Sequence, residues 1–547
     1  MKAIRSALML TLLLSAAFSC EKYVDNPLRG VQTLDSYFQT GEECQSFVTD
    51  LYQRLLIHDG WWPLQASFIA NEMATDDAWM GNTQQASGYT EMAFYTITPT
   101  NVQVFGTLYP ARFENISNCN HAITGIPKAP LGAAEISSLV AQAKFCRAYN
   151  YLELVCSFGG VPLVLAPIST SEMTLERAGK DEVYEQIFAD LKAAAAALEY
   201  QTAAQAQGKT SKAACQALLA RAYLFRGNAE KGDYENAYRY ADSVIRCGIY
   251  SLTPNFFDIW SAYEDKHNGP GSIFELQTAS VNGYSVGMEL STLTGGRGEK
   301  ASGFPSGSAD DVMDGWGWCV PTSDLENCFL SEGDSIRRKS TIAKYDEPVY
   351  RDEELNPRYY FDPSINKSQR VIRKYYIPID VRRKLIDKRG DAPLNIPLLR
   401  LAEMYLTRAE AGWYANKPAA EIAADVNIVR ERAKLNPKNG LTGFDLLYAI
   451  WKERRMELAF EGLRLYDIRR QVDPATQKTV IEGLMGPNGS FVKYNTQTST
   501  DAAELGNLVE RQDKGALFEA PKNLLWPIPQ SEIDRSMGTV KQNPGYN

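Results

Sequence analysis

The sequence predicts a mostly α-helical protein, in which tetratricopeptide-like helical hairpins form a scaffold and an irregular α+β second lobe carries long loops and short strands. Apolar residues recur at helical spacing in several long segments of both halves of the chain. Between about 251 and 395 these stripes fade, and Gly, Pro, Ser and Asp become frequent. At 547 residues the chain also exceeds the size at which one compact core usually stops growing, which favours two lobes or an extended scaffold.

The first twenty residues have the pattern of a targeting segment. Lys2 and Arg5 precede an apolar run at 7–18, and small residues stand before Cys20. The run is too short to span a bilayer as a stable helix, which needs ~20 residues. Two interpretations stay open: a lipoprotein signal, and an ordinary secretory signal with an incidental cysteine. We favour a lipoprotein signal at 1–19, with Cys20 as the lipidated mature N-terminus, because no better cleavage site follows before the chain turns polar.

The scaffold helices are predicted where a stripe of apolar residues follows a polar start. These segments are 42–56, 108–126, 135–158, 181–198, 211–227, 233–248, 397–415 and 419–433. Gly159 and Gly160 are expected to end the third of them. In 211–227 and 233–248, small residues alternate with aromatic ones, as stacked helical hairpins require. The Trp-containing stretch 58–82 breaks the pattern with Gly, Pro and paired acids, so we expect an irregular connection there.

The stretch 251–395 is predicted to form the second lobe. A structureless loop of that length would be unusual inside a compact domain. Short runs of β-type residues at 272–277 and 370–377 indicate strands within it. Closing scaffold helices are expected at about 396–470, followed by an irregular tail at 471–547.

The segment 445–470 is predicted to be a central helix that is apolar around most of its surface. Arg454, Glu457, Glu461 and Arg464 fall on one stripe of this helix, at steps that let opposite charges meet. A helix of this kind is usually enclosed by neighbours, so its charges must find partners. We therefore interpret these four residues as a structural ion-pair hub, in which they hold one another and nearby helix ends.

A metal site is the alternative explanation for this segment, with Glu453, Glu457 and Glu461 as carboxylate ligands at i, i+4 and i+8. Helical-bundle sites of this kind normally also use Glu-x-x-His motifs. None of the three histidines stands in such a motif: His58, His121 and His267. The sequence therefore predicts no metal and no cofactor.

The net charge bears on nucleic-acid binding, and the positions of the cysteines bear on disulfides. The formal net charge of −9, without a basic cluster, argues against nucleic-acid binding, which depends on neutralising phosphates. No Cys-x-x-Cys pair occurs, and four cysteines in helical segments fit small buried thiols: Cys146, Cys156, Cys215 and Cys247. Cys319 and Cys328 are close enough in sequence to suggest a disulfide.

Several blocks together resemble the SusD/RagB family of outer-membrane lipoproteins. They follow the lipoprotein cysteine in this order: AKFCRAYNYLELVCSFGGVPLV at 143–164, LLRLAEMYLTRAEAGW at 398–413, VNIVRERA at 426–433, ERRMELAFEGLRLYDIRR at 453–470, LWPIPQSEI at 525–533 and QNPGY at 542–546. The resemblance covers nearly the whole length. Ala17 before the cysteine and Leu463, where the family more often has a polar residue such as His, depart from the family pattern.

This resemblance implies a binding protein without enzymatic activity, lipid-anchored at the cell outer membrane and facing outward. It implies a helical N-terminal domain at 20–250 and a C-terminal domain at 251–547. Family members cover a SusC-like TonB-dependent transporter like a lid and deliver oligosaccharides, or in some cases peptides, to it. The helical scaffold would face the transporter while loops collect ligand.

Candidate sugar-binding residues are aromatics in segments where no helical stripe explains them, because pyranose C–H faces pack on aromatic rings. They are Trp61, Trp62, Trp79, Tyr284, Trp316 and Trp318, with the nearby polar residues Asp76, Asp77, Asn82 and Asp314 for hydroxyl groups. Trp316 and Trp318 are the preferred pair. Each Trp has an alternative role as a core anchor that pins a loop. Trp413 and Trp451 lie in predicted scaffold helices and are expected in the core.

Catalytic alternatives have weaker support. Asp76-Asp77 and Asp310-Asp311 could supply the two carboxylates of a glycosidase, although adjacent acids in loops are more often solvated turns. Ser364 and Lys367 form a Ser-x-x-Lys motif without its supporting motifs. A glycoside hydrolase therefore remains a less favoured alternative to the binding protein.

Overall fold

The computed structural model describes most of the chain. The described residues are 37–56, 63–81, 87–168, 175–279, 290–296, 300–301, 315–345, 347, 359–360, 368–378, 381, 392–497 and 514–546. Their fold is mostly helical, with short strands, as the sequence predicts. One large hydrophobic core cluster contains residues from Phe38 near the start of the described chain to Tyr546 at its end, so the two halves share a core.

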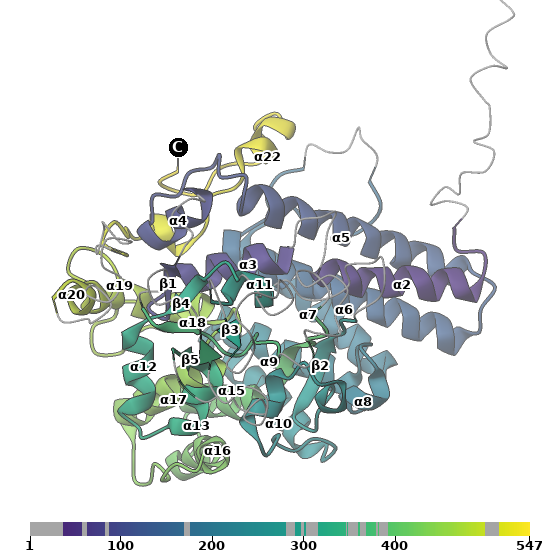
Figure 1. Cartoon of the computed structure of the whole chain (residues 1–547). Coiled ribbons are helices and arrows are strands. Elements are labelled where there is room, and N and C mark those ends of the chain that lie inside the picture. The colour runs from purple at the N-terminus through teal and green to yellow at the C-terminus, as the bar shows by residue number, and fades with distance from the viewer. Residues whose placement is uncertain are drawn as a thin grey trace, which may run out of the picture.

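Long helices dominate the first half of the chain (Figure 1). The helices of this half are α2 (Gly41–Leu56), α3 (Pro63–Met73), α4 (Ser87–Phe94), α5 (Phe105–Gly125), α6 (Ala133–Phe158), α7 (Lys180–Ala197), α8 (Ala203–Ala206), α9 (Lys212–Arg226) and α10 (Asp233–Arg246). Gly159 ends α6 in a left-handed conformation with φ of +75°, and its N–H donates to Val155 O at 3.0 Å. The predicted end of this helix is therefore confirmed.

The scaffold is a continuous series of packed helices. Helix α6 packs on α5 and α7, α7 packs on α9, and α9 packs on α10. The series continues from α10 to α15 (Leu401–Tyr414), which contacts α16 (Ala419–Arg432) and α17 (Gly443–Leu458). Small side chains permit the close approach, since Ala220 and Ala241 are fully buried. The rings of Phe188 and Tyr223 stack between α7 and α9 with centroids 3.7 Å apart.

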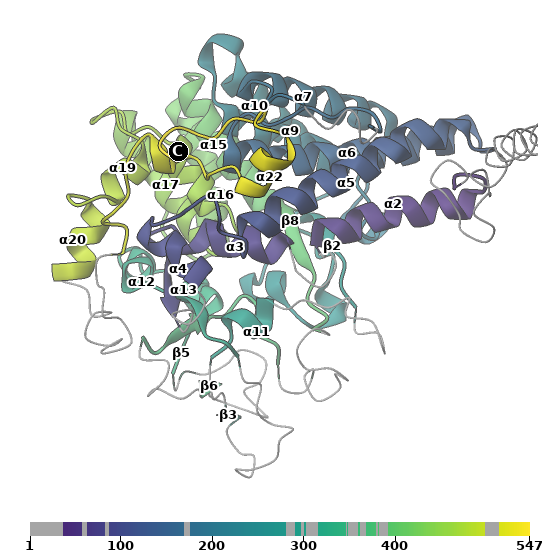
Figure 2. The same ribbon diagram turned by 90° about the horizontal axis from the view of Figure 1, so that it is seen from above.

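The second lobe contains paired short strands and short helices. Among the described residues, strands of this lobe pair with one another or with β1 and β8, which lie outside it, in four two-stranded antiparallel sheets: β1 (Ala78–Gly81) with β4 (Trp318–Pro321), β2 (Ser272–Leu276) with β8 (Ile396–Arg400), β3 (Lys300–Ala301) with β6 (Tyr359–Tyr360) and β5 (Ile342–Lys344) with β7 (Arg370–Ile372). Its helices are α11 (Leu290–Thr294), α12 (Ser323–Leu330) and α13 (Ser335–Thr341). Strands β2 and β7 lie where the sequence predicts them. Figure 2 shows β3, β5 and β6 on the side of the molecule away from α7, α9 and α10.

Two local predictions are wrong. The stretch 58–82, expected to be irregular, contains helix α3, which begins at Pro63. Proline suits the first position of a helix, because a backbone N–H at that position would have no partner within the helix. Phe68, Ile69 and Met73 of α3 are buried. The segment 397–415 is not helical from its start, because its first four residues belong to strand β8 and pair with β2.

The segment 445–470 is two helices instead of the single helix that the sequence predicts. Helix α17 ends at Leu458, and α18 (Arg464–Arg470) begins after a turn. Phe460 and Gly462 adopt left-handed conformations in this turn, with φ of +60° and +75°. The Tyr375 hydroxyl donates to Phe460 O at 2.6 Å, so a buried hydrogen bond fixes the point where the chain changes direction.

The C-terminal segment returns across the scaffold. It contains the short helices α19 (Val480–Leu484), α20 (Ser490–Gln497) and α22 (Gln530–Arg535). Trp526 is fully buried, and its backbone N–H donates to Ser157 O at 2.8 Å. The Asn543 side chain donates to Phe158 O at 2.9 Å and to Trp526 O at 2.7 Å. The tail is thereby attached to the end of α6.

Candidate functional site

Three aromatic side chains from two parts of the chain form a cluster, called here the aromatic platform: Tyr89, Trp316 and Trp318. The centroids of the Trp316 and Trp318 rings are 5.0 Å apart with an interplanar angle of 53°. The Trp318 and Tyr89 centroids are also 5.0 Å apart, at 49°. Trp316 and Trp318 are half-buried and pack against the main core, whereas Tyr89 is buried. The preferred pair of the sequence analysis therefore lies together, on a rigid base.

The β1–β4 sheet positions this platform. Gly81 pairs with Trp318, and Trp79 pairs with Val320. Gly81 has φ of +62°, and a Cβ atom at this position would lie 1.8 Å from Gly317 O. Only glycine fits here, because any side chain would meet the backbone of Gly317, the residue just before the partner strand.

Helix α11 holds the segment before β4. The Trp316 backbone N–H donates to Thr292 O at 2.7 Å, and the Gly317 N–H donates to Gly295 O at 2.8 Å. A Cβ at Gly315 would lie 2.3 Å from the backbone of Gly295. These close backbone contacts fix the direction of both tryptophans, which lowers the entropy that a ligand must remove on binding.

Trp79 does not share the exposure of the platform. Its side chain is 1% exposed and forms a separate buried cluster with Val320. In this structure the ring is closed to a ligand, so the core-anchor alternative describes Trp79 and corrects the expectation of a binding role.

Asp76 and Asp77 are neither solvated nor open to ligand hydroxyls, contrary to the sequence-based expectation. Both are fully buried. The Arg455 guanidinium lies 2.9 Å from Asp76 Oδ2 and 2.7 Å from Asp77 Oδ1, and Arg464 Nη2 lies 2.8 Å from Asp76 Oδ2. Burial alone would raise the pKa of Asp76, but Arg455 and Arg464 hold it below its usual range. These carboxylates therefore bind arginines of α17 and α18 just before the start of β1, and they are not an accessible catalytic pair.

Two further buried ionisable groups lie at the same place. The Lys514 ammonium donates to the carbonyl oxygens of Thr75 and Ala78, on either side of the paired aspartates. Burial lowers the pKa of Lys514 to about 8. Burial, followed by the nearby charge of Asp77, raises the pKa of Glu72 to about 8. Glu72 is therefore mostly protonated at neutral pH, and its Oε1 accepts from the Gly462 N–H at 2.8 Å.

The remaining predicted ligand-binding residues lie outside the described residues: Trp61, Trp62, Asn82, Tyr284 and Asp314. The same holds for Cys20, for the Asp310-Asp311 pair, and for Ser364 with Lys367. Their roles stay predictions. Tyr89 is the platform residue that the sequence analysis missed. Tyr89 lies in a short helix, and it belongs to the site because the tertiary fold places its ring beside that of Trp318.

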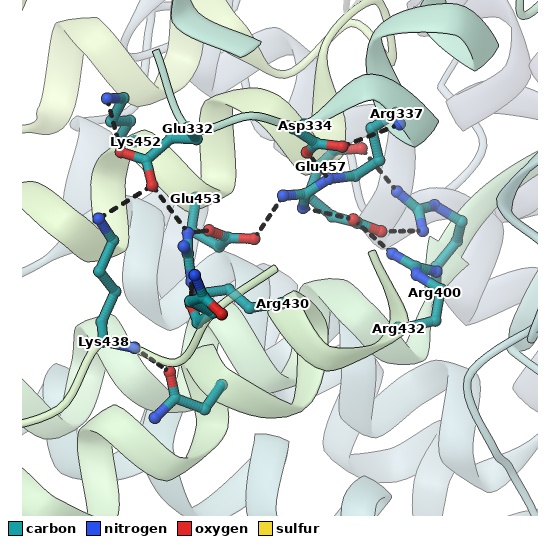
Figure 3. A network of polar contacts seen from close by, with 12 residues as sticks. Glu332, Asp334, Arg337, Arg400, Arg430, Arg432, Lys438, Lys452, Glu453 and Glu457 are labelled. Carbon is teal, nitrogen blue, oxygen red and sulfur yellow. Dashed lines mark hydrogen bonds and ion pairs between the residues drawn. The ribbon is translucent and has the colours of Figure 1, made fainter. Parts of the chain in front are cut away.

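The charged residues of 445–470 form a buried network (Figure 3). Glu457 is fully buried, with Arg337 Nη1 at 3.1 Å, Arg400 Nη1 at 2.9 Å and Arg432 Nη2 at 2.5 Å from its carboxylate oxygens. Burial would raise the pKa of Glu457, but the three guanidinium groups hold it well below its usual range.

The expectation that the four hub residues hold one another is wrong. Each of them pairs with residues outside this set of four, and Glu457 and Glu461 share Arg400 of strand β8. Glu461 accepts from Lys374 at 2.7 Å and from Arg400 at 2.6 Å. Arg454 pairs with Asp467 at 2.7 Å, and Arg464 pairs with Asp76. The ion pairs of the hub connect several helices, strand β8 and the turn before β1. The sequence predicts ion pairs along a single stripe of one helix.

The same geometry answers the metal alternative. Glu453 lies 2.7 Å from Arg337 Nη2 and 2.9 Å from Arg430 Nη1, so basic side chains occupy the carboxylates that a metal would need. Within the described ranges, no group of three or more His, Cys, Asp or Glu residues is placed to hold a metal ion.

Two smaller expectations, on the cysteines and on two tryptophans, have clear outcomes. Cys319 and Cys328 are both buried free thiols, so the suggested disulfide is wrong. Trp451 is buried, whereas Trp413 is half-buried and donates its indole N–H to Gly443 O at 2.8 Å. No helix in the described part of the chain has both the length and the hydropathy needed to cross a membrane.

Comparison with known proteins gives consistent matches along the chain. Residues 33–224 match a family model described as "Starch-binding associating with outer membrane", and residues 364–546 match the model of the SusD family. The chain is 26% identical to SusD-like protein P2 of Formosa agariphila over 98% of both chains.

Solved structures show the same fold. A protein described as "Laminarin binding SusD-like protein" superposes with a TM-score of 0.72 at 24% identity, covering 93% of this chain and 100% of that one. Surface glycan-binding protein A from Bacteroides thetaiotaomicron gives a TM-score of 0.71 at 21% identity, with the same coverage. The two family models together match more than half of the chain. On these matches, the chain belongs to the SusD/RagB family.

Proposed function

We propose that this protein binds oligosaccharides on the aromatic platform and passes them to a TonB-dependent outer-membrane transporter. The observation that carries the proposal is the tilted, half-buried Trp316–Trp318 pair on a rigid backbone base. Half-buried rings keep part of their surface available, and pyranose rings pack on such surfaces through their C–H groups. The proposal assigns no catalytic role, and it is supported at one candidate carboxylate pair, Asp76 and Asp77, which arginine encloses.

The names of structural relatives support the ligand class. One is described as laminarin-binding, and surface glycan-binding protein A from Bacteroides thetaiotaomicron has been solved in complex with laminarihexaose. Glucan oligosaccharides are therefore the first ligands to test. Peptides remain the alternative ligand that the family resemblance offers.

The proposed location is the cell outer membrane. The N-terminal family model is described as associating with it. Lipid on Cys20 would be the anchor, after removal of the signal at 1–19. The helical domain at 20–250 and the domain at 251–547 would together form a lid over a SusC-like transporter. Recovery of that transporter with the protein, from detergent-solubilised outer membranes of its host, tests this part of the proposal.

Calorimetric titration tests the ligand class. The protein is titrated separately with laminarihexaose, maltohexaose, cellohexaose and a tryptic peptide digest of casein. We expect saturable binding of at least one glucan and none of the peptides. Binding of peptides alone would support the peptide alternative. Release of new reducing ends from any glucan, in proportion to protein added and through successive purification steps, would support a hydrolase.

A further inference from the structure

A groove, called here the α17–α19 groove, lies between α17 and the segment that contains α19. Its volume is about 760 Å³, within the usual range for small-molecule sites. Tyr448 and Trp451 of α17, together with Phe518 from the tail, supply its aromatic lining. It shares no lining residue with the aromatic platform. Figure 2 shows α17 and α19 well apart from α11, the helix that supports the platform.

Tyr448 presents a fixed aromatic surface to this groove. Its side chain is 38% exposed, and its hydroxyl donates to Asp473 Oδ1 at 2.7 Å. Asp473 is itself held by the Ala475 N–H at 2.9 Å and by the Thr476 hydroxyl at 3.1 Å. The ring of Trp451 lies behind, with its centroid 5.9 Å from that of Tyr448. The tyrosine ring is thus oriented before any ligand arrives.

The polar lining offers hydrogen-bond donors and acceptors side by side. Lys478 and Asn488 are exposed, and their side chains have no partner among the described residues. One carboxylate oxygen of Glu482 caps α19 by accepting from Thr479, and the other oxygen is free of recorded contacts among those residues. Sugar hydroxyl groups both donate and accept, so a lining of this kind suits a neutral polyhydroxylated ligand. A charged ligand would instead favour a lining of one sign.

We propose that the α17–α19 groove is a second carbohydrate site, in which one sugar ring packs on Tyr448 and its hydroxyl groups bind Lys478, Glu482 and Asn488. The site is independent of the platform in position, but its ligand class is the one proposed for the platform. Two sites on one chain would let a long glycan bind at two points, which raises its apparent affinity above that of a short oligosaccharide.

Native affinity electrophoresis through gels containing laminarin, starch, xylan or mannan tests this inference. The starting protein is the Trp316→Ala/Trp318→Ala variant, which lacks the platform, so any retardation reports other sites. We expect at least one polysaccharide to retard this variant, and the further change Tyr448→Ala to weaken that binding about fivefold or more through loss of the stacking ring.

Phe444→Ala is the matched control. Phe444 lies one turn before Tyr448 on the same helix, is 48% exposed and does not line the groove. We expect its loss to leave retardation unchanged. Equal effects of Phe444→Ala and Tyr448→Ala, or no retardation of the platform variant by any polysaccharide, would overturn the second site.

Two further results separate the possible failures. If the parent with an intact platform binds glycans but the platform variant does not, the proposed function stands and only the groove fails. If the parent binds casein peptides in a way that Tyr448→Ala abolishes, the groove exists but its ligand class is wrong. Thermal unfolding of each variant checks that lost retardation does not reflect lost structure.

Discussion

Glu457→Ala should destabilise the protein strongly, because it removes the shared acceptor of three buried guanidinium groups. Arg337 would keep Asp334 and Glu453 as partners, and Arg400 would keep Glu461. Arg432 would be left without its carboxylate partner, resting on the ring of Phe256 with its guanidinium carbon 4.7 Å from the centroid. Breaking a buried ion pair by removing one member typically costs about 3–5 kcal/mol, so we expect a loss in that range.

An exposed ion pair provides the control for this prediction. Asp181 lies 2.8 Å from Lys231, and both side chains are well exposed. Asp181→Ala should therefore lower the free energy of unfolding by only about 0–1 kcal/mol. Urea unfolding at 25 °C and pH 7, followed by circular dichroism and by tryptophan fluorescence, measures both variants; coincident transitions would show that a two-state fit is valid.

A Glu457→Ala protein as stable as Asp181→Ala would contradict this prediction. It would mean that water or rearranged side chains compensate Arg432, and that the network is not a structural hub. Loss of glycan binding at unchanged stability would contradict the separation between a charged scaffold and an aromatic ligand surface.

Three further predictions concern pH, backbone geometry and anchoring. The pKa of Glu72 is about 8 in the folded protein, against an ordinary value of 4.5, so the parent should lose stability as the pH rises from about 4.5 to about 8. The Glu72→Gln variant cannot titrate at this position and should lack this loss. Identical urea midpoints for parent and variant at both pH 5 and pH 9 would contradict the prediction. Gly81→Ala should lower both stability and glycan affinity, because its Cβ would meet Gly317 O. In the control Gly440→Ala, the residue has φ of +72° and open space around it, so the change should cost only backbone strain of about 1–2 kcal/mol. Equal unfolding curves for the two variants would argue against a steric role of Gly81. Cys20→Ala should move the protein from the membrane pellet to the soluble fraction, and its retention in the pellet would exclude lipid on Cys20 as the anchor.

Helical periodicity predicts the scaffold well because its helices repeat one packing pattern. The ends of α6 and the α9–α10 hairpin follow from local signals, namely Gly159 and the alternation of alanine with aromatic residues. Strand β8 could not be predicted in this way, because its partner β2 lies more than a hundred residues earlier. A short apolar run before a helix looks like the first turn of that helix until its pairing partner is known.

Charge spacing indicates buried residues but does not identify their partners. The stripe of Arg454, Glu457 and Glu461 suggests mutual pairing, yet the left-handed turn at Phe460 directs Glu461 toward Lys374 and Arg400. Paired aspartates have the same difficulty. Asp76 and Asp77 have the composition of a solvated turn, and only the three-dimensional fold brings Arg455 and Arg464 to them.

The aromatic platform was predictable in part. Trp316 and Trp318 stand out because they lie in a Gly-rich segment without a helical stripe. Trp79 also lies in a segment without a helical stripe, but its side chain is buried against Val320. Tyr89 lies in a short helix and has no sequence signal that distinguishes it from a core residue.

The binding role of Trp316 and Trp318 is tested by comparing the calorimetric affinities of the parent and of the Trp316→Ala/Trp318→Ala variant for the glucan hexasaccharide that the parent binds most tightly. We predict that the variant binds at least about tenfold more weakly, since two stacking surfaces are lost. Its melting temperature should fall by only a few degrees, because both rings are half-buried. Unchanged affinity, or an unfolded variant, which would mean that the two rings anchor the core, would contradict the claim that these tryptophans bind the ligand.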